Sequence, residues 1–212
     1  MDTSELIKAL ASDPQRPARP ISTLWLFAAG VSIAIAAIVF LTVLGLRSDI
    51  VAALETPRFL FKFLVTGTLA VSAFNCVSAL SRPGESWRNE VLCLAIAPVL
   101  LAMAVVVELF ALPSDLWTAT TIGRNSVVCL TYIPFIGLGP LAVFLWVLRY
   151  SAPTNPAFAG SVAGLLAGGI AAAFYAAQCT DDSPLFVAMW YTIAITILAI
   201  LGAVGGRRFA RW

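Results

Sequence analysis

Six long apolar segments constrain this chain more than any other feature of its sequence. They cover residues 24–46, 59–80, 91–112, 127–148, 158–177 and 185–204. A helix rises about 1.5 Å per residue, so roughly 20 apolar residues cross the hydrocarbon core of a bilayer. The mean hydropathy of +0.94 agrees with this interpretation. The sequence therefore predicts an all-α membrane protein, with a bundle of six transmembrane helices in residues 24–212 and a tail at residues 1–23.

Composition excludes several classes of function. The chain has no histidine, which removes the commonest general base and the commonest zinc ligand. Its formal net charge of +2 is too small to indicate a nucleic-acid partner. The sequence also contains no glycine-rich phosphate loop and no nucleophile elbow. We therefore expect neither enzymatic activity nor a constitutive cofactor.

Basic residues predict how the bundle is oriented. An even number of spans puts both termini on the same side of the membrane, and cytoplasmic loops carry an excess of lysine and arginine. The termini and the loops on their side contain Lys8, Arg16, Arg19, Arg82, Arg88, Arg149, Arg207, Arg208 and Arg211. The opposite face has only Arg47, Arg58 and Arg124, with Lys62 just inside the second span. Both termini are therefore expected in the cytoplasm.

The tail contains a short amphipathic pattern. Leu6, Ile7 and Leu10 fall on one helical face with Lys8 opposite, which predicts a helix over residues 3–12. Prolines interleaved with Arg16 and Arg19 then end the helix and impose an extended spacer. A helix of about ten residues is marginal alone, so its apolar stripe needs a surface to dock on. That surface is a cytoplasmic protein, the bilayer, or the loops of the bundle itself.

The expected topology divides the four cysteines by compartment. Cys129 and Cys179 fall at the outer, oxidising face, whereas Cys76 and Cys93 lie near the cytoplasmic ends of spans and are typical small packing residues. Exposed outer thiols can sense oxidants, bind a soft metal ion as thiolates, or form a structural disulfide. The chain has no Cys-x-x-Cys motif, which disfavours a thiol oxidoreductase.

Lys62 and Glu108 are ionisable residues inside apolar segments. Both lie toward the outer ends of their spans, at similar depth, so an ion pair between them is geometrically allowed. Such residues are functional candidates, and a small-solute or ion transporter is the alternative function that they suggest. Both are also within about one turn of a boundary, where snorkelling suffices.

Two acidic residues and a glycine stripe complete the candidate features. Asp181 and Asp182 follow Cys179 and are expected to cap the sixth span, or to support a cation near the thiols. Gly160, Gly164 and Gly168 recur every four residues in the fifth span. Such a face favours close helix packing, either inside the bundle or in a homodimer.

Several stretches resemble the NrsF family. They are TSELIKAL at residues 3–10, LGLRSD at 44–49 with Pro57, Arg58, Phe59 and Lys62, and CTDDSPLF at 179–186 followed by Trp190 and Tyr191. The resemblance implies a six-span anti-sigma factor in a bacterial inner membrane, which restrains an extracytoplasmic-function sigma factor through its cytoplasmic N-terminal segment. It also implies that a pair of outer cysteines responds to heavy metals or oxidants, and Cys129 and Cys179 match that pair by position.

The resemblance gives the tail residues roles in binding the sigma factor. Leu6, Ile7 and Leu10 would supply apolar contacts in a groove of the sigma factor. The basic residues of the tail, Lys8, Arg16 and Arg19, would meet acidic groups at its rim. The expected partners are thus a sigma factor and the lipid bilayer, with a transient heavy-metal ion as the stimulus.

Overall fold

The structure is a computed structural model that describes residues 3, 5, 21–82, 87–151 and 153–209. Of the expected tail helix, only Thr3 and Glu5 are among them. The candidate sigma-binding residues Leu6, Ile7, Lys8, Leu10, Arg16 and Arg19 lie outside the described residues.

The described chain is helical and contains no strand. Its long helices are α2 (Ile21–Val43), α4 (Pro57–Leu80), α6 (Ile96–Ala111) preceded by α5 (Arg88–Leu94), α8 (Ser126–Leu148), α9 (Pro156–Ala176) and α11 (Thr192–Phe209), which continues α10 (Pro184–Phe186) and the π-helix η2 (Val187–Tyr191). Short helices α3 (Ile50–Ala53), η1 (Ser114–Leu116) and α7 (Trp117–Ile122) lie in the connections. Six helical segments are long and apolar enough to cross a membrane. The all-α class and the number of candidate spans are thus confirmed.

Local chemistry sets two helix boundaries. Helix α2 ends at Val43, three residues before the end of the expected segment, because Gly45 turns the chain in the left-handed region with φ 72°. The amides of Leu44 and Gly45 both donate to the Phe40 carbonyl, as at glycine-terminated helix ends. The third segment is interrupted at Ala95, three residues before Pro98, because the proline has no amide to donate and its ring crowds the preceding turn.

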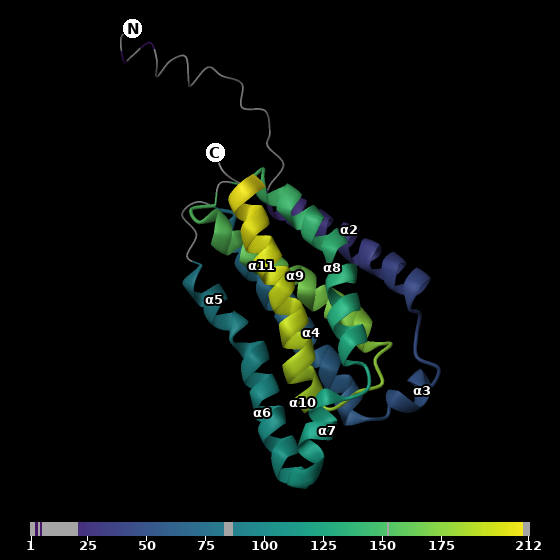
Figure 1. Cartoon of the computed structure of the whole chain (residues 1–212). Helices are drawn as coiled ribbons and strands as arrows, with labels where there is room; N and C mark the ends of the chain where they lie inside the picture. The colour runs from purple at the N-terminus through teal and green to yellow at the C-terminus, as the bar shows by residue number, and fades with distance from the viewer. Residues whose placement is uncertain (1–2, 4, 6–20, 83–86, 152, 210–212) are drawn as a thin grey trace.

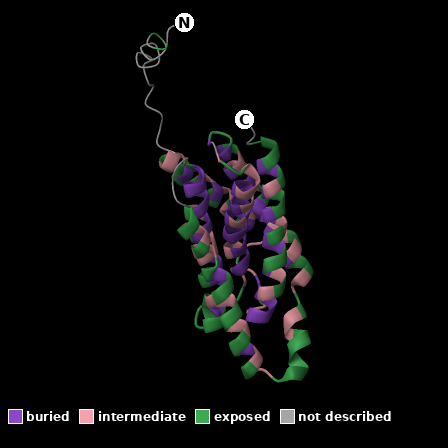
Figure 2. Ribbon diagram, turned by 90° about the vertical axis from the view of Figure 1, so that its left-hand side faces the viewer, coloured by how far each residue is buried: buried purple, intermediate pink, exposed green. Residues whose placement is uncertain are grey.

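Helix α9 lies at the centre of the bundle. It contacts α4, α8 and α11 and is the most buried of the six segments, whereas the α5–α6 segment lies at the periphery (Figure 1). Buried residues face the inside of the bundle in Figure 2. We call the end that carries Ile21 and Phe209 the tail end. The opposite end, with α3, α7 and the 177–183 connection, is the loop end (Figure 1).

The glycine stripe of the fifth span packs inside the bundle. A methyl group added at Gly160 would collide with the Gly202 carbonyl of α11, and one added at Gly164 would collide with the Leu198 carbonyl. Small residues let the two backbones approach closely. Because α11 covers it, this stripe is not available for a homodimer contact.

Candidate functional site

The connection between α9 and α10, residues 177–183, lies at the centre of the loop end. Two cations from different elements hold it: Lys62 from α4 and Arg47 from the connection between α2 and α3. The Lys62 ammonium donates to the Cys179 carbonyl at 2.9 Å and forms a 2.5 Å salt bridge with Asp182. One Arg47 nitrogen, Nη1, lies 3.1 Å from the Asp182 carboxylate and 3.3 Å from the Cys179 carbonyl. We call these four residues the clamp.

Arg47 is itself fixed by Asp49. Its Nε and Nη2 atoms each lie 2.7 Å from an oxygen of the Asp49 carboxylate, a bidentate pairing. These hydrogen bonds raise the pKa of Arg47 and lower the pKa of Asp49 to about 2. Both groups therefore stay charged over the whole physiological pH range.

Lys62 is fully buried, at 0% exposure. The snorkelling expected for this residue is wrong, because its ammonium turns inward to two acceptors of the 177–183 connection rather than outward to water. A buried ammonium requires such partners, since removing one member of a buried pair leaves an uncompensated charge. The Lys62–Asp182 salt bridge thus links α4 tightly to this connection.

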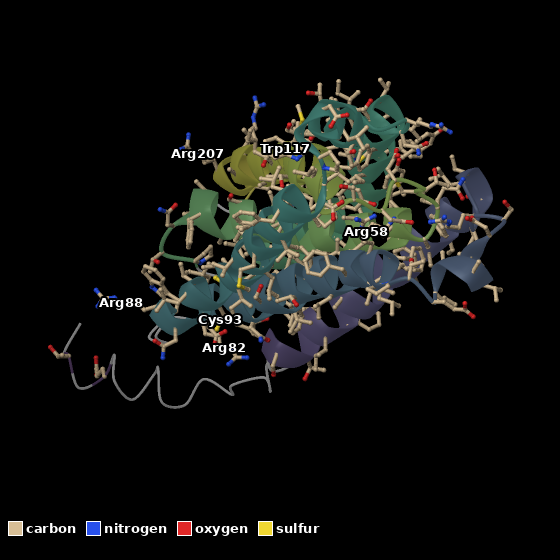
Figure 3. All side chains as sticks on the ribbon, turned by 90° about the horizontal axis from the view of Figure 1, so that it is seen from below. Arg58, Arg82, Arg88, Cys93, Trp117 and Arg207 are labelled. Carbon is tan, nitrogen blue, oxygen red and sulfur yellow. The ribbon has the colours of Figure 1, made fainter. Side chains whose placement is uncertain are left out.

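Lys62 and Glu108 do not pair with each other, although their similar depth allows an ion pair. Glu108 is buried on α6 and forms a 3.0 Å salt bridge with Arg58, the exposed arginine labelled in Figure 3. Its other oxygen accepts from the Ser183 hydroxyl at 3.3 Å. Arg58 lies one helical turn before Lys62 on α4, so neighbouring turns of one helix supply the two cations to different acidic partners.

Asp181 caps a different helix from the one expected. Its Oδ2 atom accepts from the backbone amides of Arg124 at 3.0 Å and Asn125 at 2.8 Å, and from the Asn125 side chain at 2.9 Å. The carboxylate therefore satisfies donors at the start of α8, the fourth span, where negative charge also suits the helix dipole. The start of the sixth span is capped by Ser183, whose hydroxyl accepts from the Leu185 amide. Asp182 belongs to the clamp and caps neither helix.

Cys129 and Cys179 both lie at the loop end of the bundle. Cys129 is in the first turn of α8, and Cys179 is in the 177–183 connection, which Asp181 joins to the start of that helix. Both are free, and they are 0% and 2% exposed. The expectation of exposed thiols is therefore wrong, because helices and the clamped connection cover them. Burial raises the pKa of the Cys179 thiol, so this thiol is neutral in the closed site, and a reagent reaches it only when the site opens.

Two tyrosines line the thiol site. The Cys179 amide donates to the Tyr175 carbonyl at the end of α9 at 3.0 Å, and the rings of Tyr175 and of Tyr191 in the π-helix form an edge contact with centroids 5.8 Å apart. The Tyr191 hydroxyl is buried and has no hydrogen-bond partner within the described part of the chain. π-Helical turns are often found at functional sites. We therefore include both tyrosines in the candidate site.

Metal binding at this site would use few ligands. The described residues contain no group of three or more Cys, Asp or Glu side chains that could hold a metal ion. Two thiols without a third protein ligand suit a soft, thiophilic ion better than Zn²⁺, which usually takes four ligands.

Comparison with known proteins identifies the family. A family model described as "Negative regulator of sigma F", NrsF, matches residues 10–212. The anti-sigma-F factor NrsF of Caulobacter vibrioides (strain NA1000 / CB15N) is 34% identical over 215 residues, which cover 100% of both chains. This chain belongs to the NrsF family. The probable anti-sigma-F factor NrsF of Azospira oryzae (strain ATCC BAA-33 / DSM 13638 / PS) is 30% identical with the same full coverage. No solved structure matches the chain.

The NrsF match confirms the resemblance found in the sequence and indicates a regulatory rather than a catalytic protein. The matched region of this NrsF-family chain includes the clamp, both thiols and both tyrosines. Sequence reasoning had not assigned a role to Arg47, Asn125, Tyr175 or Tyr191. Arg47 and Tyr191 do lie within the stretches that resemble the NrsF family, which is the signal that could have pointed to them.

Proposed function

We propose that this chain is a membrane-bound anti-sigma factor that sequesters an extracytoplasmic-function sigma factor and releases it when Cys129 and Cys179 react with a heavy metal or an oxidant. Membership of the NrsF family carries the first part of the proposal. The two buried free thiols at the loop end, one on α8 and one in the 177–183 connection, support the second part.

The charge distribution supports an orientation with the tail end in the cytoplasm of a bacterial inner membrane. Arg82, Arg88 and Arg207, labelled in Figure 3, belong to the tail end together with Arg149 and Arg208. Cytoplasmic segments carry such an excess of arginine. In this orientation the thiols face the oxidising side, where their reaction with oxidants is favoured.

The chemistry at the thiols is simple to state. A two-electron oxidant would convert the thiols of Cys129 and Cys179 into a disulfide, with release of two protons, while the oxidant accepts both electrons. A soft divalent ion would instead replace both thiol protons and bridge the two sulfurs. Either reaction adds a link, a disulfide or a bridging metal ion, between the 177–183 connection and α8. The position of this connection relative to α4 then changes, because the clamp joins the two.

Helix α4 connects the thiol site with the base of the tail. Lys62 lies near the N-terminal end of α4. At the other end, Ser81 follows the last turn of α4 and accepts a 3.1 Å hydrogen bond from the Trp25 indole. Trp25 is buried in the second turn of α2, shortly after the tail. A coupling of about 1–3 kcal/mol between the two ends would change affinity for a partner roughly 5- to 150-fold.

The tail is the proposed binding segment for the sigma factor. Replacing Leu6 and Leu10 with aspartate should abolish co-purification of the sigma factor with the membrane protein, since it puts two charges on the apolar stripe. The measurement is affinity purification of the tagged full-length chain from its native membranes, with mass spectrometry of the eluate.

A matched control puts the same two charges on the polar face of the predicted tail helix, as Ser4→Asp with Ser12→Asp. This variant should retain the sigma factor. If the unmodified chain yields no sigma factor, the proposal fails. Solute movement in liposomes after removal of residues 1–20 would then favour a transporter, the alternative suggested by the charged residues in the spans.

A further inference from the structure

The least expected side chain in this bundle is Lys62. It is an ammonium group with no exposed surface, on a helix whose other buried residues are apolar or small. It lies in the second turn of α4, about 8 Å along the axis from Pro57. A charge at such a position is costly, and its polar contacts identify what it stabilises.

Both oxygen atoms that the Lys62 ammonium contacts belong to the segment that carries a thiol. The ammonium reaches the Cys179 carbonyl at 2.9 Å and the Asp182 carboxylate at 2.5 Å. Arg47 touches the same two groups, but its contact with the Cys179 carbonyl is longer, at 3.3 Å, and two of its nitrogens are occupied by Asp49. Lys62 therefore makes the shorter of the two side-chain contacts with the Cys179 carbonyl.

From this geometry we infer that Lys62 is a positioning residue for Cys179: its hydrogen bond to the Cys179 carbonyl holds this peptide in place and keeps the thiol covered. The inference deepens the proposed function, because it names what sets the resting state of a sensing thiol. Only the sensing role of the Cys179 thiol rests on the proposed function, because the accessibility of this thiol can be measured without any sigma factor.

The Cys179 thiol becomes uncovered when the contacts of the clamp break. Reagents reach a buried thiol only while its segment is transiently open, so the reaction rate follows the population of the open form. Moving residues 177–183 away from α4 would leave the fully buried Lys62 ammonium without the carboxylate and the carbonyl that compensate its charge. As long as Lys62 is present, this cost keeps the open form rare.

The test measures alkylation of Cys179 by N-ethylmaleimide in native membranes. Cys76, Cys93 and Cys129 are replaced by alanine in the full-length chain, so that only Cys179 reacts. In this background Lys62→Met should raise the alkylation rate about tenfold, the change expected for the loss of a hydrogen bond from a charged donor. Arg149→Met, which removes an exposed cation after α8 at the tail end, should change the rate less than about twofold.

A second background separates positioning from general loss of stability. Cys76 is fully buried near the opposite end of the same helix, so a chain whose only cysteine is Cys76 reports opening of the tail end. Lys62→Met should leave its alkylation rate unchanged. Equal acceleration at Cys76 and Cys179 would mean that the whole bundle had loosened, and would overturn the inference.

The double variant Lys62→Met with Asp182→Asn covers the case in which the single variant does not fold. It removes both charges of the buried pair, which is far less costly than removing one. The Cys179 carbonyl still loses its ammonium donor, so Cys179 should again react about tenfold faster. Alkylation at the parent rate in the variants that fold would show that Lys62 does not position Cys179. Failure of the proposed function would instead appear as absence of a sigma factor from the purified complex.

Discussion

At the scale of single residues, Asp181 shows how one side chain joins segments that are distant in the sequence. Its Oδ2 atom accepts three hydrogen bonds from Arg124 and Asn125, more than 50 residues earlier in the chain. Two of the donors are backbone amides before the first turn of α8, which have no partner inside the helix. Asp181 therefore fixes the start of α8, where Cys129 lies, to the connection that carries Cys179.

Replacing Asp181 with alanine should lower the stability of the bundle by about 1–2 kcal/mol, the usual cost of losing a helix cap and its charged acceptor. Thermal unfolding of the purified protein in detergent would measure this change. Asp115→Ala, an exposed acidic residue of η1, serves as the control and should have little effect. Equal loss of stability in both variants would contradict the assigned role of Asp181.

The buried thiol of Cys179 predicts a specific pH dependence. Its pKa is raised in the folded state by burial, so the folded chain holds this proton more tightly than the unfolded chain does. The resulting contribution to stability is complete below the unfolded thiol pKa of about 8.5 and is lost as the pH rises through the higher folded value.

Alkylation of Cys179 in native membranes should therefore still accelerate with pH above about 9.5, where an unfolded thiol is already mostly ionised. The comparison is the same Cys179-only chain dissolved in denaturing detergent, whose rate should level off earlier. Identical pH profiles for the two samples would contradict a raised pKa.

At the scale of secondary-structure elements, the closest contact in the bundle is between α9 and α11. Glycines on both helices allow it, because a side chain at Gly160 or Gly164 would occupy the space of the α11 backbone. This contact positions both ends of the 177–183 connection, because α9 precedes the connection and the α10–η2–α11 segment follows it. The geometry of the thiol site thus depends on how closely these two helices pack.

Gly164→Ala should destabilise the protein by about 1–3 kcal/mol, the usual cost of overpacking, because the added methyl group meets backbone that cannot move aside. Gly30→Ala is a matched control on α2, where an added methyl group meets nothing within 4 Å. It should be neutral or slightly stabilising, since alanine favours a helix more than glycine does. Unfolding in increasing concentrations of denaturing detergent would compare them.

At the scale of the whole molecule, five of the six long segments send a side chain or an end to the region around residues 177–183. These are α4 with Lys62, α6 with Glu108, α8 with Cys129, and the ends of α9 and α10. The connection after α2 adds Arg47. The residues around the 177–183 connection thus come from nearly the whole bundle.

Replacing Cys129 or Cys179 singly with serine should abolish induction of sigma-dependent transcription by metal or oxidant, because each variant lacks one of the two sulfurs. A transcriptional reporter in the native host measures this response. Cys76→Ser and Cys93→Ser are matched controls that should leave induction unchanged. If both loop-end variants respond normally, the thiols are not the sensor.

The sequence by itself determined the elements. Six apolar runs of about 20 residues predict helices, since backbone groups in lipid must satisfy one another locally. The tertiary structure decided which polar groups meet. Lys62 and Glu108 lie at similar depth, yet Lys62 pairs with Asp182 and Glu108 pairs with Arg58. The reason is that packing sets the rotation of α4 and α6 about their axes, and this rotation decides which side chains meet. Asp181 and Cys179 likewise acquire their roles from contacts across distant segments. Hydrophobic length is a local property that can be read along the chain, whereas the site is made of long-range contacts that exist only after the helices have packed.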